Sequence, residues 1–352
     1  MSTKADHRLS SLSGLGIILV VFGHSEPYTG VLLLQKESGT GALLLHQLIA
    51  WIYTFHMPLF FAMAGYAYVR FTAIKRQGML QFLRIKTERL LLPYVVLSTL
   101  AYPAKAVLSI FAQRPIEFGV LAYGKQLLFP WYNVIIAFWF LPTLFLMLIL
   151  CRLILHRNSG SLWYWTVMLA SCISFCIFPA QKGTGWGALL NCCGVLHNFV
   201  FAWTGVVIAR FHGEELIKKF GYWLAPISVT FFIIGHRIGD VSPVTMLMSI
   251  SGLVAAWSFV CQFDSRALDY LGNWSYTIYL LSWFPQIGCR ILADQVFHPP
   301  LASIVIFMFV SGVTIPVVAG IWLQQHDWPV IQKICGVPPA GPKRPESVSQ
   351  PQ

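Results

Sequence analysis

The chain has 352 residues, of which 57% are hydrophobic and only 11% are charged, and its mean hydropathy is +0.67. Soluble domains carry about 25% charged residues, so this composition excludes an ordinary soluble protein and indicates an integral membrane protein. The formal net charge of +11 does not indicate nucleic-acid binding, because the Lys and Arg residues lie in short clusters between apolar runs, as in positive-inside membrane proteins.

The apolar segments follow one another closely. A membrane-spanning helix needs about 20 mostly apolar residues, and on this measure the chain has about ten spans. We expect them at residues 12–34, 48–69, 90–111, 134–155, 162–178, 186–209, 222–236, 243–261, 274–292 and 301–323. No repeat with a period of about 20 to 50 residues is evident, which disfavours a repeat array. The predicted fold class is therefore an all-α integral membrane protein with about ten transmembrane helices in one bundle.

The Lys and Arg positions predict the orientation of the spans. With the N-terminus in the cytoplasm, 17 of the 24 Lys and Arg residues fall on the cytoplasmic side and 7 on the outer side. The 7 outer residues are Lys36, Lys105, Arg114, Lys125, Lys182, Arg237 and Arg290. Because cytoplasmic loops carry the excess of Lys and Arg, both termini are expected in the cytoplasm. Residues 324–352 are polar and rich in proline, which predicts a disordered cytoplasmic tail after a membrane-embedded domain of residues 9–323.

The first span carries His24 near its outer end, in the run LSGLGIILVVFGHS. A histidine is costly to bury in the hydrocarbon layer, which makes it a candidate for function. Neutral imidazole can take a proton from a hydroxyl group, as acyl transfer to an alcohol requires, so we interpret His24 as catalytic. A histidine hydrogen-bonded only for packing is the alternative. Glu26 is a candidate to orient His24 only if the helix ends before Pro27, because residues two apart on a helix do not face each other.

The second span carries His56 beside Pro58. Proline removes a helical hydrogen bond and clashes with the carbonyl of Thr54, which predicts a kink next to His56. This span runs from the outside inward, so His56 is expected in the outer half of the membrane, at a depth similar to that of His24. We interpret His56 as a second catalytic residue, and a packing kink with a hydrogen-bonded histidine is the alternative.

Five runs follow one another along the chain: SGLGIILVVFGHS, FHMPLFFAMAGYAY, RLLLPYVV, FWFLPTLF and YLGNWSYTIYLLSWF. In this order they resemble the acyltransferase-3 family of membrane O-acyltransferases, over about residues 9–284. The resemblance implies a multi-pass enzyme of the bacterial inner membrane that transfers an acyl group, usually acetyl, to a surface or secreted glycan such as an exopolysaccharide. It implies acetyl-CoA, or another acyl-CoA, as the donor from the cytoplasm, and it implies that His24 is catalytic.

Two places depart from the family pattern. The family usually has an acidic residue and then Arg or Lys before the histidine of the first span, where this chain has Ser10 and Ser13. The family's ninth-span YLLH histidine is Ser282 here. Losing these groups weakens a phosphate or substrate contact, so either Arg8 substitutes for them or this chain differs in donor or activity.

A basic loop precedes the third span. We expect Arg84, Lys86 and Arg89 to bind acyl-CoA, because arginine pairs with phosphate through a planar fork and lysine through a point charge. The family is similar in placing an RxxR element here, which the run from Lys86 to Arg89 matches with Lys in the first place. The alternative is that these residues only set the topology and contact anionic lipid.

Aromatic and polar residues are also predicted at the outer face. Tyr132 and Trp139 offer aromatic surfaces, and His236 and Arg237 lie in a short outer turn. We expect these four residues to bind the acceptor, a glycan or lipid-linked saccharide. The alternative for the aromatic residues is the membrane aromatic belt.

The predicted function is thus acyl transfer, with two alternatives. One is a transporter or flippase for a glycan or lipid-linked intermediate, in which His24, Glu26 and His56 relay protons. The other is a sensor or scaffold that lost catalysis with the changes at Ser13 and Ser282. We expect no permanently bound cofactor, and because the eight cysteines show no CxxC pair, no metal site.

Overall fold

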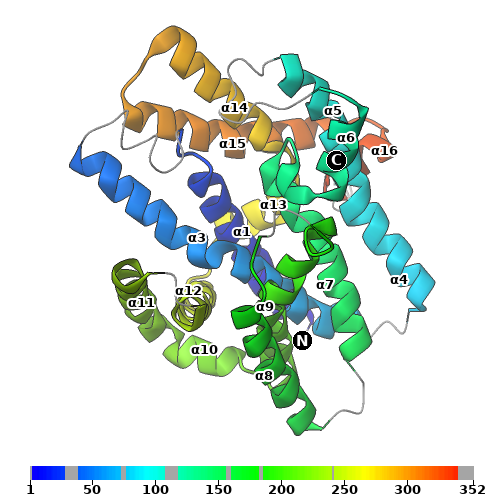
Figure 1. Ribbon diagram of the computed structural model, residues 1–352, viewed down its shortest axis with the longest axis vertical. Helices are drawn as coiled ribbons and strands as arrows, with labels where there is room; N and C mark the ends of the chain where they lie inside the picture. Colours follow the sequence, from blue (N-terminus) through cyan, green and yellow to red (C-terminus); the bar gives the residue numbers. More distant parts are fainter. Residues whose placement is uncertain are drawn as a thin grey trace, which may run out of the picture.

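The computed structural model describes residues 2–27, 39–72, 77–107, 118–155, 160–181, 185–239 and 242–339, and every regular element within them is helical (Figure 1). The α-helices among them are α1 (Ser2–Gly23), α3 (Thr40–Ala67), α4 (Met79–Lys86), α5 (Leu92–Val107), α6 (Val120–Leu128), α7 (Phe140–Ile154), α8 (Ser161–Ile177), α9 (Cys192–Arg210), α10 (Glu214–Phe220), α11 (Leu224–Ile238), α12 (Ser242–Gln262), α13 (Arg266–Leu281), α14 (Trp283–Leu292), α15 (Leu301–Gln324) and α16 (Pro329–Ile334). The all-α class is confirmed.

Several of these helices can cross a membrane. Those that are long and apolar enough in the described residues number seven: Thr40–Phe71, Met79–Val107, Ile136–Ile154, Leu189–Arg210, Glu214–Gly235, Ser242–Gln262 and Leu301–Gln324. Two more apolar helices are shorter, His7–Gly23 and Ser161–Ile177. The chain is therefore a multi-pass membrane protein. The predicted count of ten spans is not confirmed, and the cytoplasmic position of both termini stays a prediction.

The expected ninth span, residues 274–292, is not a single helix in the structure. Helix α13 ends at Leu281, and α14 begins at Trp283. Ser282 lies between them, so residues 274–292 form two helices rather than one. The expected ends of the first and third spans, residues 34 and 111, lie outside the described residues.

Two helix pairs approach each other through glycine. Helix α1 packs along α13, and α3 packs along α9; α1 and α13 lie in the middle of the bundle in Figure 1. A Cβ atom added at Gly272 would lie 1.8 Å from the carbonyl oxygen of Ser10, and one at Gly205 would lie 1.8 Å from that of Ala62. Small residues allow this backbone approach in membrane helices, where packing replaces the hydrophobic effect as the driving force.

Helix α3 continues through Pro58, and the expected strain at this proline is relieved from a neighbouring helix. Proline leaves the carbonyl group of Thr54, four residues earlier, without its helical partner. The hydroxyl of Ser249 on α12 donates a hydrogen bond to this carbonyl oxygen at 2.7 Å. Such a substitute partner is what allows a proline inside a membrane helix.

The tail expected to be disordered from residue 324 is folded over its first part. Helix α16 forms at Pro329–Ile334, and the side chain of Lys333 forms an ion pair with Glu88. The hydroxyl of Thr277 donates to the carbonyl oxygen of Gly336 at 2.9 Å. The expectation was wrong here because Ile334 and Val337 pack against the bundle. The average composition of the tail is polar and does not reveal these two apolar residues. Residues 340–352 lie outside the described residues.

The glycine contact between α3 and α9 gives a test of the packing. We expect Gly205→Ala to destabilise the protein by about 1–3 kcal/mol, because the added methyl group overpacks a backbone contact. Gly124→Ala in α6 is the matched control, since nothing lies within 4 Å of its Cβ position. Alanine is the better helix former by about 0.8–1 kcal/mol, so this control should be neutral or stabilising. Thermal unfolding in detergent measures both, and equal midpoints for the two variants would contradict the packing described.

Candidate active site

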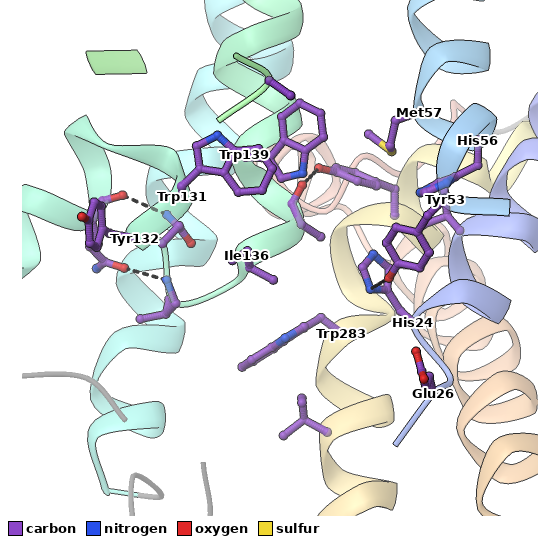
Figure 2. Close-up of a pocket in the computed structure, with 18 of the residues that line it drawn as sticks. His24, Glu26, Tyr53, His56, Met57, Trp131, Tyr132, Ile136, Trp139 and Trp283 are labelled. Atoms are coloured by element: carbon purple, nitrogen blue, oxygen red, sulfur yellow. Dashed lines mark hydrogen bonds between the residues drawn. The ribbon is translucent and has the colours of Figure 1, made fainter. Parts of the chain in front are cut away.

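A cavity of about 1170 Å³ opens between α3, α5, α6, α14 and the segment that precedes α7. His24, Tyr53 and His56 lie on one side of it, and Trp131 and Trp139 lie on another (Figure 2). Pockets for drug-sized ligands span about 300–1,000 Å³, so this cavity has room for a molecule of oligosaccharide size. It brings together both histidines predicted from the sequence.

His24 is placed by the end of helix α1. The helix ends at Gly23, and the backbone N–H of His24 donates to the carbonyl oxygen of Val20 at 3.0 Å. The carbonyl groups of a last helical turn need partners from elsewhere. Gln286 of α14 supplies one, because its Nε2 donates to the carbonyl oxygen of Val21 at 2.9 Å and to the hydroxyl of Ser25 at 3.2 Å. The end of α1 is thereby fixed with His24 at the cavity.

Tyr53 lies between the two histidines. Its hydroxyl oxygen is 3.1 Å from Nδ1 of His24 and 3.4 Å from the carbonyl oxygen of Gly23. Its ring packs edge-on against the His56 ring, with the centroids 4.8 Å apart. When the hydroxyl donates to Gly23, it accepts a hydrogen bond from Nδ1–H of His24. In that state Nε2 of His24 keeps its lone pair and can accept a proton.

The tautomer of His56 follows from its partner. Nδ1 lies 2.9 Å from the carbonyl oxygen of Ile52, and a carbonyl oxygen can only accept. Nδ1 therefore carries the hydrogen, and Nε2 of the neutral ring is an acceptor. The His56 side chain is buried, with 2% exposed, and it lines the cavity. A neutral His56 can thus accept a hydrogen bond from a bound hydroxyl group but cannot donate one from Nε2.

Glu26 lines the same cavity but has a different partner from the one expected. Its Oε1 lies 3.1 Å from Nδ1 of His46, on the first part of α3. The helix does end before Pro27, as the pairing of Glu26 with His24 required, yet no direct contact between these two side chains is found among the described residues. Glu26 therefore fixes the segment after α1 to α3 rather than orienting His24.

The aromatic wall of the cavity includes two of the predicted acceptor residues. Trp139 stacks on Trp131, with ring centroids 4.8 Å apart and an angle of 13° between the planes. The indole N–H of Trp131 donates to Asn191 at 3.0 Å, which fixes the pair. Tyr132 also lines the cavity, and the Lys125 ammonium group lies 4.2 Å from its ring centroid. Flat aromatic surfaces beside polar groups suit a bound saccharide.

The other two predicted acceptor residues lie elsewhere. His236 and Arg237 lie in the last turn of α11, and the side chain of His236 is outside the described residues. Arg237 is exposed and is not among the residues that line the cavity. The cavity is lined instead by residues that were not predicted as site residues, among them Tyr53, Lys105 and Trp283. Tyr53 had a sequence signal, because it lies three residues before His56 and so shares its helix face.

A second cavity, of about 250 Å³, contains two of the three predicted donor-binding residues. Lys86 and Arg89 line it, and Arg89 lies in a π-helical turn, Thr87–Leu91. The Arg89 guanidinium group is 5.7 Å from the ring centroid of Tyr276, which lines the cavity as well. Arg84 does not line it: its Nε donates to Glu88 at 2.9 Å, and 81% of its side chain is exposed.

The two cavities share part of their walls. Val20, Met57 and Tyr279 line both of them. One cavity therefore begins where the other ends, with the two histidines on one side of these three residues and the two cations on the other. This arrangement suits a reaction between two substrates that enter from opposite ends.

Comparison with known proteins identifies the family. The family model of the acyltransferase domain, acyltransferase-3, matches residues 7–323. The chain belongs to this family. It is also 32% identical, over 202 residues, to nodulation protein NolL of Mesorhizobium japonicum strain LMG 29417 / CECT 9101 / MAFF 303099, which covers 56% of this chain and 49% of NolL. The chain thus matches about half the length of this relative. No solved structure matches it.

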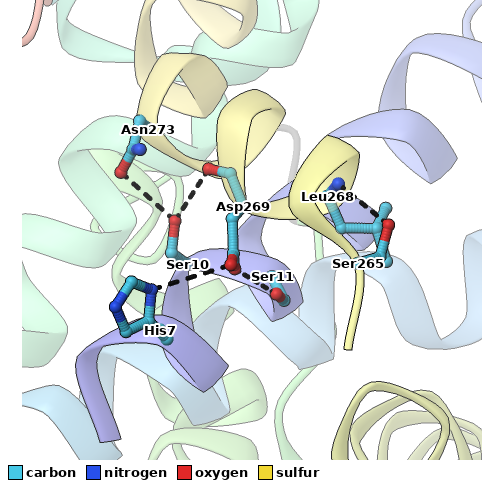
Figure 3. Close-up of polar contacts among 7 residues, drawn as sticks. All are labelled: His7, Ser10, Ser11, Ser265, Leu268, Asp269 and Asn273. Atoms are coloured by element: carbon cyan, nitrogen blue, oxygen red, sulfur yellow. Dashed lines mark hydrogen bonds and ion pairs between the residues drawn. The ribbon is translucent and has the colours of Figure 1, made fainter. Parts of the chain in front are cut away.

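The serines at which this acyltransferase departs from its family lie at the interface of α1 and α13 and at the end of α13. Ser10 donates to the carbonyl oxygen of Asp269 at 3.0 Å, and Ser11 is hydrogen-bonded to the carboxylate of the same residue (Figure 3). Ser13 lines the smaller cavity with Lys86 and Arg89, so a cation at its position would be a third one there. Ser282 is buried at the junction of α13 and α14.

The contact between Tyr53 and His24 gives a test within this family of enzymes. Tyr53→Phe keeps the ring between the two histidines but removes the hydroxyl that orients His24. Because a lost hydrogen bond is worth about 0.5–1.5 kcal/mol, we expect acyl transfer to slow by about 3- to 10-fold at an unchanged unfolding temperature. Tyr123→Phe is the matched control, since its hydroxyl bonds to Thr99 and it lines neither cavity. Equal rates for the two variants would show that the hydroxyl has no role.

Proposed function

We propose that this acyltransferase transfers an acyl group, acetyl in the simplest case, from acyl-CoA to a hydroxyl group of a cell-surface or secreted glycan. We place the acceptor at the outer side of a bacterial inner membrane and the donor at the cytoplasmic side. One observation carries the proposal: the cavity that holds His24 and His56 adjoins a separate cavity that holds Lys86 and Arg89. Membership of the acyltransferase-3 family supports the acyl transfer itself.

The smaller cavity suits the donor. Coenzyme A carries several phosphate groups, and Lys86 and Arg89 supply the cations that pair with phosphate. The remaining lining of this cavity is mostly apolar, for example Leu90 and Phe140, which suits the acyl end of the molecule. With its phosphates at the cations, the thioester points toward the wall shared with the larger cavity.

The larger cavity suits the acceptor and the proton transfer. A glycan hydroxyl near Nε2 of His24 gives its proton to the imidazole while its oxygen attacks the thioester carbon. The C–S bond then breaks, and the leaving thiolate takes the proton from the imidazolium. His24 thereby returns to its neutral form. Neutral His56 accepts a hydrogen bond from the saccharide through Nε2 and so orients it. In this tautomer Nε2 of His56 carries no hydrogen, so it cannot donate a hydrogen bond to the oxyanion.

The alternative of a proton-relaying transporter has less support. A relay through His24, Glu26 and His56 needs these groups to contact one another, but the hydrogen bond of Glu26 in the described residues is with His46. Tyr53, not Glu26, is the residue between the two histidines.

Replacing the catalytic histidine tests the proposal. A general base contributes about 10²- to 10⁴-fold to a rate, so His24→Asn should abolish detectable acylation of the host's surface glycans. His298→Asn is the matched control, because His298 is exposed, lines neither cavity and has a positive φ of 44° that asparagine tolerates. Mass profiles are compared for the deletion strain and for strains restored with each form of the gene.

We expect an acetyl mass increment that is lost on deletion, returns with the wild type and with His298→Asn, and stays absent with His24→Asn at equal expression. Equal acetylation in all strains would remove the support for catalysis. Loss of the whole glycan on deletion would instead favour the transporter.

The donor cavity predicts a difference between two arginines. Arg89→Gln removes a phosphate partner that lines the cavity, so the KM for acetyl-CoA should rise about 10-fold, since hydrogen bonds to charged groups are worth about 1.5–3 kcal/mol. Arg84→Gln is the matched control, because Arg84 is also an exposed arginine but is paired with Glu88 and does not line the cavity. Steady-state kinetics in detergent measures both, and a larger effect of Arg84→Gln would place the donor elsewhere.

A further inference from the structure

The larger cavity is rich in cations. Of the seven Lys and Arg residues that the charge pattern assigns to the outer face, four lie in the described residues, and three of these line the cavity: Lys105, Lys125 and Arg290. Among the described residues, Glu26 is the single acidic residue that lines this cavity, and its carboxylate is already paired with His46. Because outer segments of membrane proteins are generally depleted of Lys and Arg, cations gathered in one outer cavity call for a reason other than topology.

One of these cations, Lys105, and the neighbouring Gln126 both bind the backbone of Val134. The ammonium group of Lys105, on α5, donates to the carbonyl oxygen of Val134 at 3.1 Å. Oε1 of Gln126, on α6, accepts from the backbone N–H of Val134 at 3.2 Å. Asn133 holds this segment in place, because its Nδ2 donates to the hydroxyl of Ser98 at 2.9 Å. Lys125 precedes Gln126, and its ammonium group lies 4.2 Å from the ring centroid of Tyr132.

Gln126 carries a buried donor. Its side chain lines the cavity with 2% exposed, and its Nε2 has no hydrogen-bond partner within the described residues. The bond from Val134 to Oε1 fixes which end of the amide is the nitrogen. A buried N–H group without an acceptor is destabilising, so such a group in a cavity wall suits an acceptor atom on a ligand.

We infer that the acceptor is an anionic saccharide, whose carboxylate or phosphate oxygens are held by Lys105, Lys125 and the amide of Gln126. All three groups donate hydrogen bonds, and two of them are charged, which is the chemistry that recognises an anionic oxygen. The stacked Trp131 and Trp139 offer the ring surface for the sugar itself. The saccharide then spans from this anion site toward His24, where the hydroxyl group is acylated.

This inference rests on the proposed function, and direct binding separates the two. Two pairs of probes are used with the full chain in detergent, each with a charged and a neutral member. Trigalacturonate and its trimethyl ester test a carboxylate, and N-acetylglucosamine 1-phosphate and free N-acetylglucosamine test a phosphate. Isothermal calorimetry gives the affinity of each, and the preferred pair identifies the source of the anion.

The test variant combines Lys105→Gln with Lys125→Gln. Arg237→Gln is the matched control, because Arg237 is an outer-face cation that does not line the cavity. We expect the wild type to bind one charged probe more tightly than its neutral partner. The double variant should weaken the binding of that charged probe by about 100-fold or more, since two hydrogen bonds from charged groups are lost. Its binding of the neutral probe should not change, and Arg237→Gln should leave both affinities unchanged.

Equal binding of charged and neutral probes by the wild type would overturn the inference, and so would an equal loss of both in the double variant. Acetyl-CoA turnover is measured alongside. Charge-dependent binding without any turnover keeps the anion site and removes the proposed acyl transfer. Equal turnover of neutral and charged acceptors keeps the proposed acyl transfer and removes the anion site.

Discussion

The hydrogen bond from Gln286 to the carbonyl oxygen of Val21 is the contact on which the arrangement of the site depends. It joins α14 to the end of α1, 265 residues away in the sequence, and it stabilises the point at which the chain leaves the helix and presents His24. Gln286 can reach this point because α13 packs against α1 and α14 follows α13 directly after Ser282.

The two histidines are not equivalent, because different oxygen atoms face their Nδ1 atoms. Both have neutral forms whose tautomer is selected by oxygen atoms nearby: Ile52 for His56, and Tyr53 with Gly23 for His24. A carbonyl group is a fixed acceptor, whereas a tyrosine hydroxyl can donate or accept. His56 is therefore held in one tautomer, whereas the tautomer of His24 depends on the direction in which the hydroxyl of Tyr53 points.

Hydropathy and the depth of each span were enough to predict an all-helical membrane protein and to place His24 and His56 near each other. They were not enough to predict the division of the ninth span into α13 and α14, because an average over about 19 residues stays apolar across Pro285, which has no N–H to donate to the carbonyl oxygen of Leu281. The partner of Glu26 was missed because His46 lies in the loop-proximal start of α3, outside the span assigned to that helix. Arg84 and Arg89 looked alike in the sequence. The π-helical turn that begins at Thr87 places only Arg89 at the cavity.

The wall between the two cavities is what the proposed chemistry must cross. Val20 has a stiff, branched side chain, and the hydroxyl of Tyr279 is anchored on the carbonyl oxygen of Ala137 at 2.6 Å. Met57, the third shared residue, is unbranched, with several rotatable bonds, and adapts its shape at little cost. An acyl group that passes from the donor cavity to His24 therefore displaces Met57 rather than its neighbours. Met57 directly follows His56 in the chain. Movement of Met57 would therefore be felt at His56, the residue proposed to orient the acceptor.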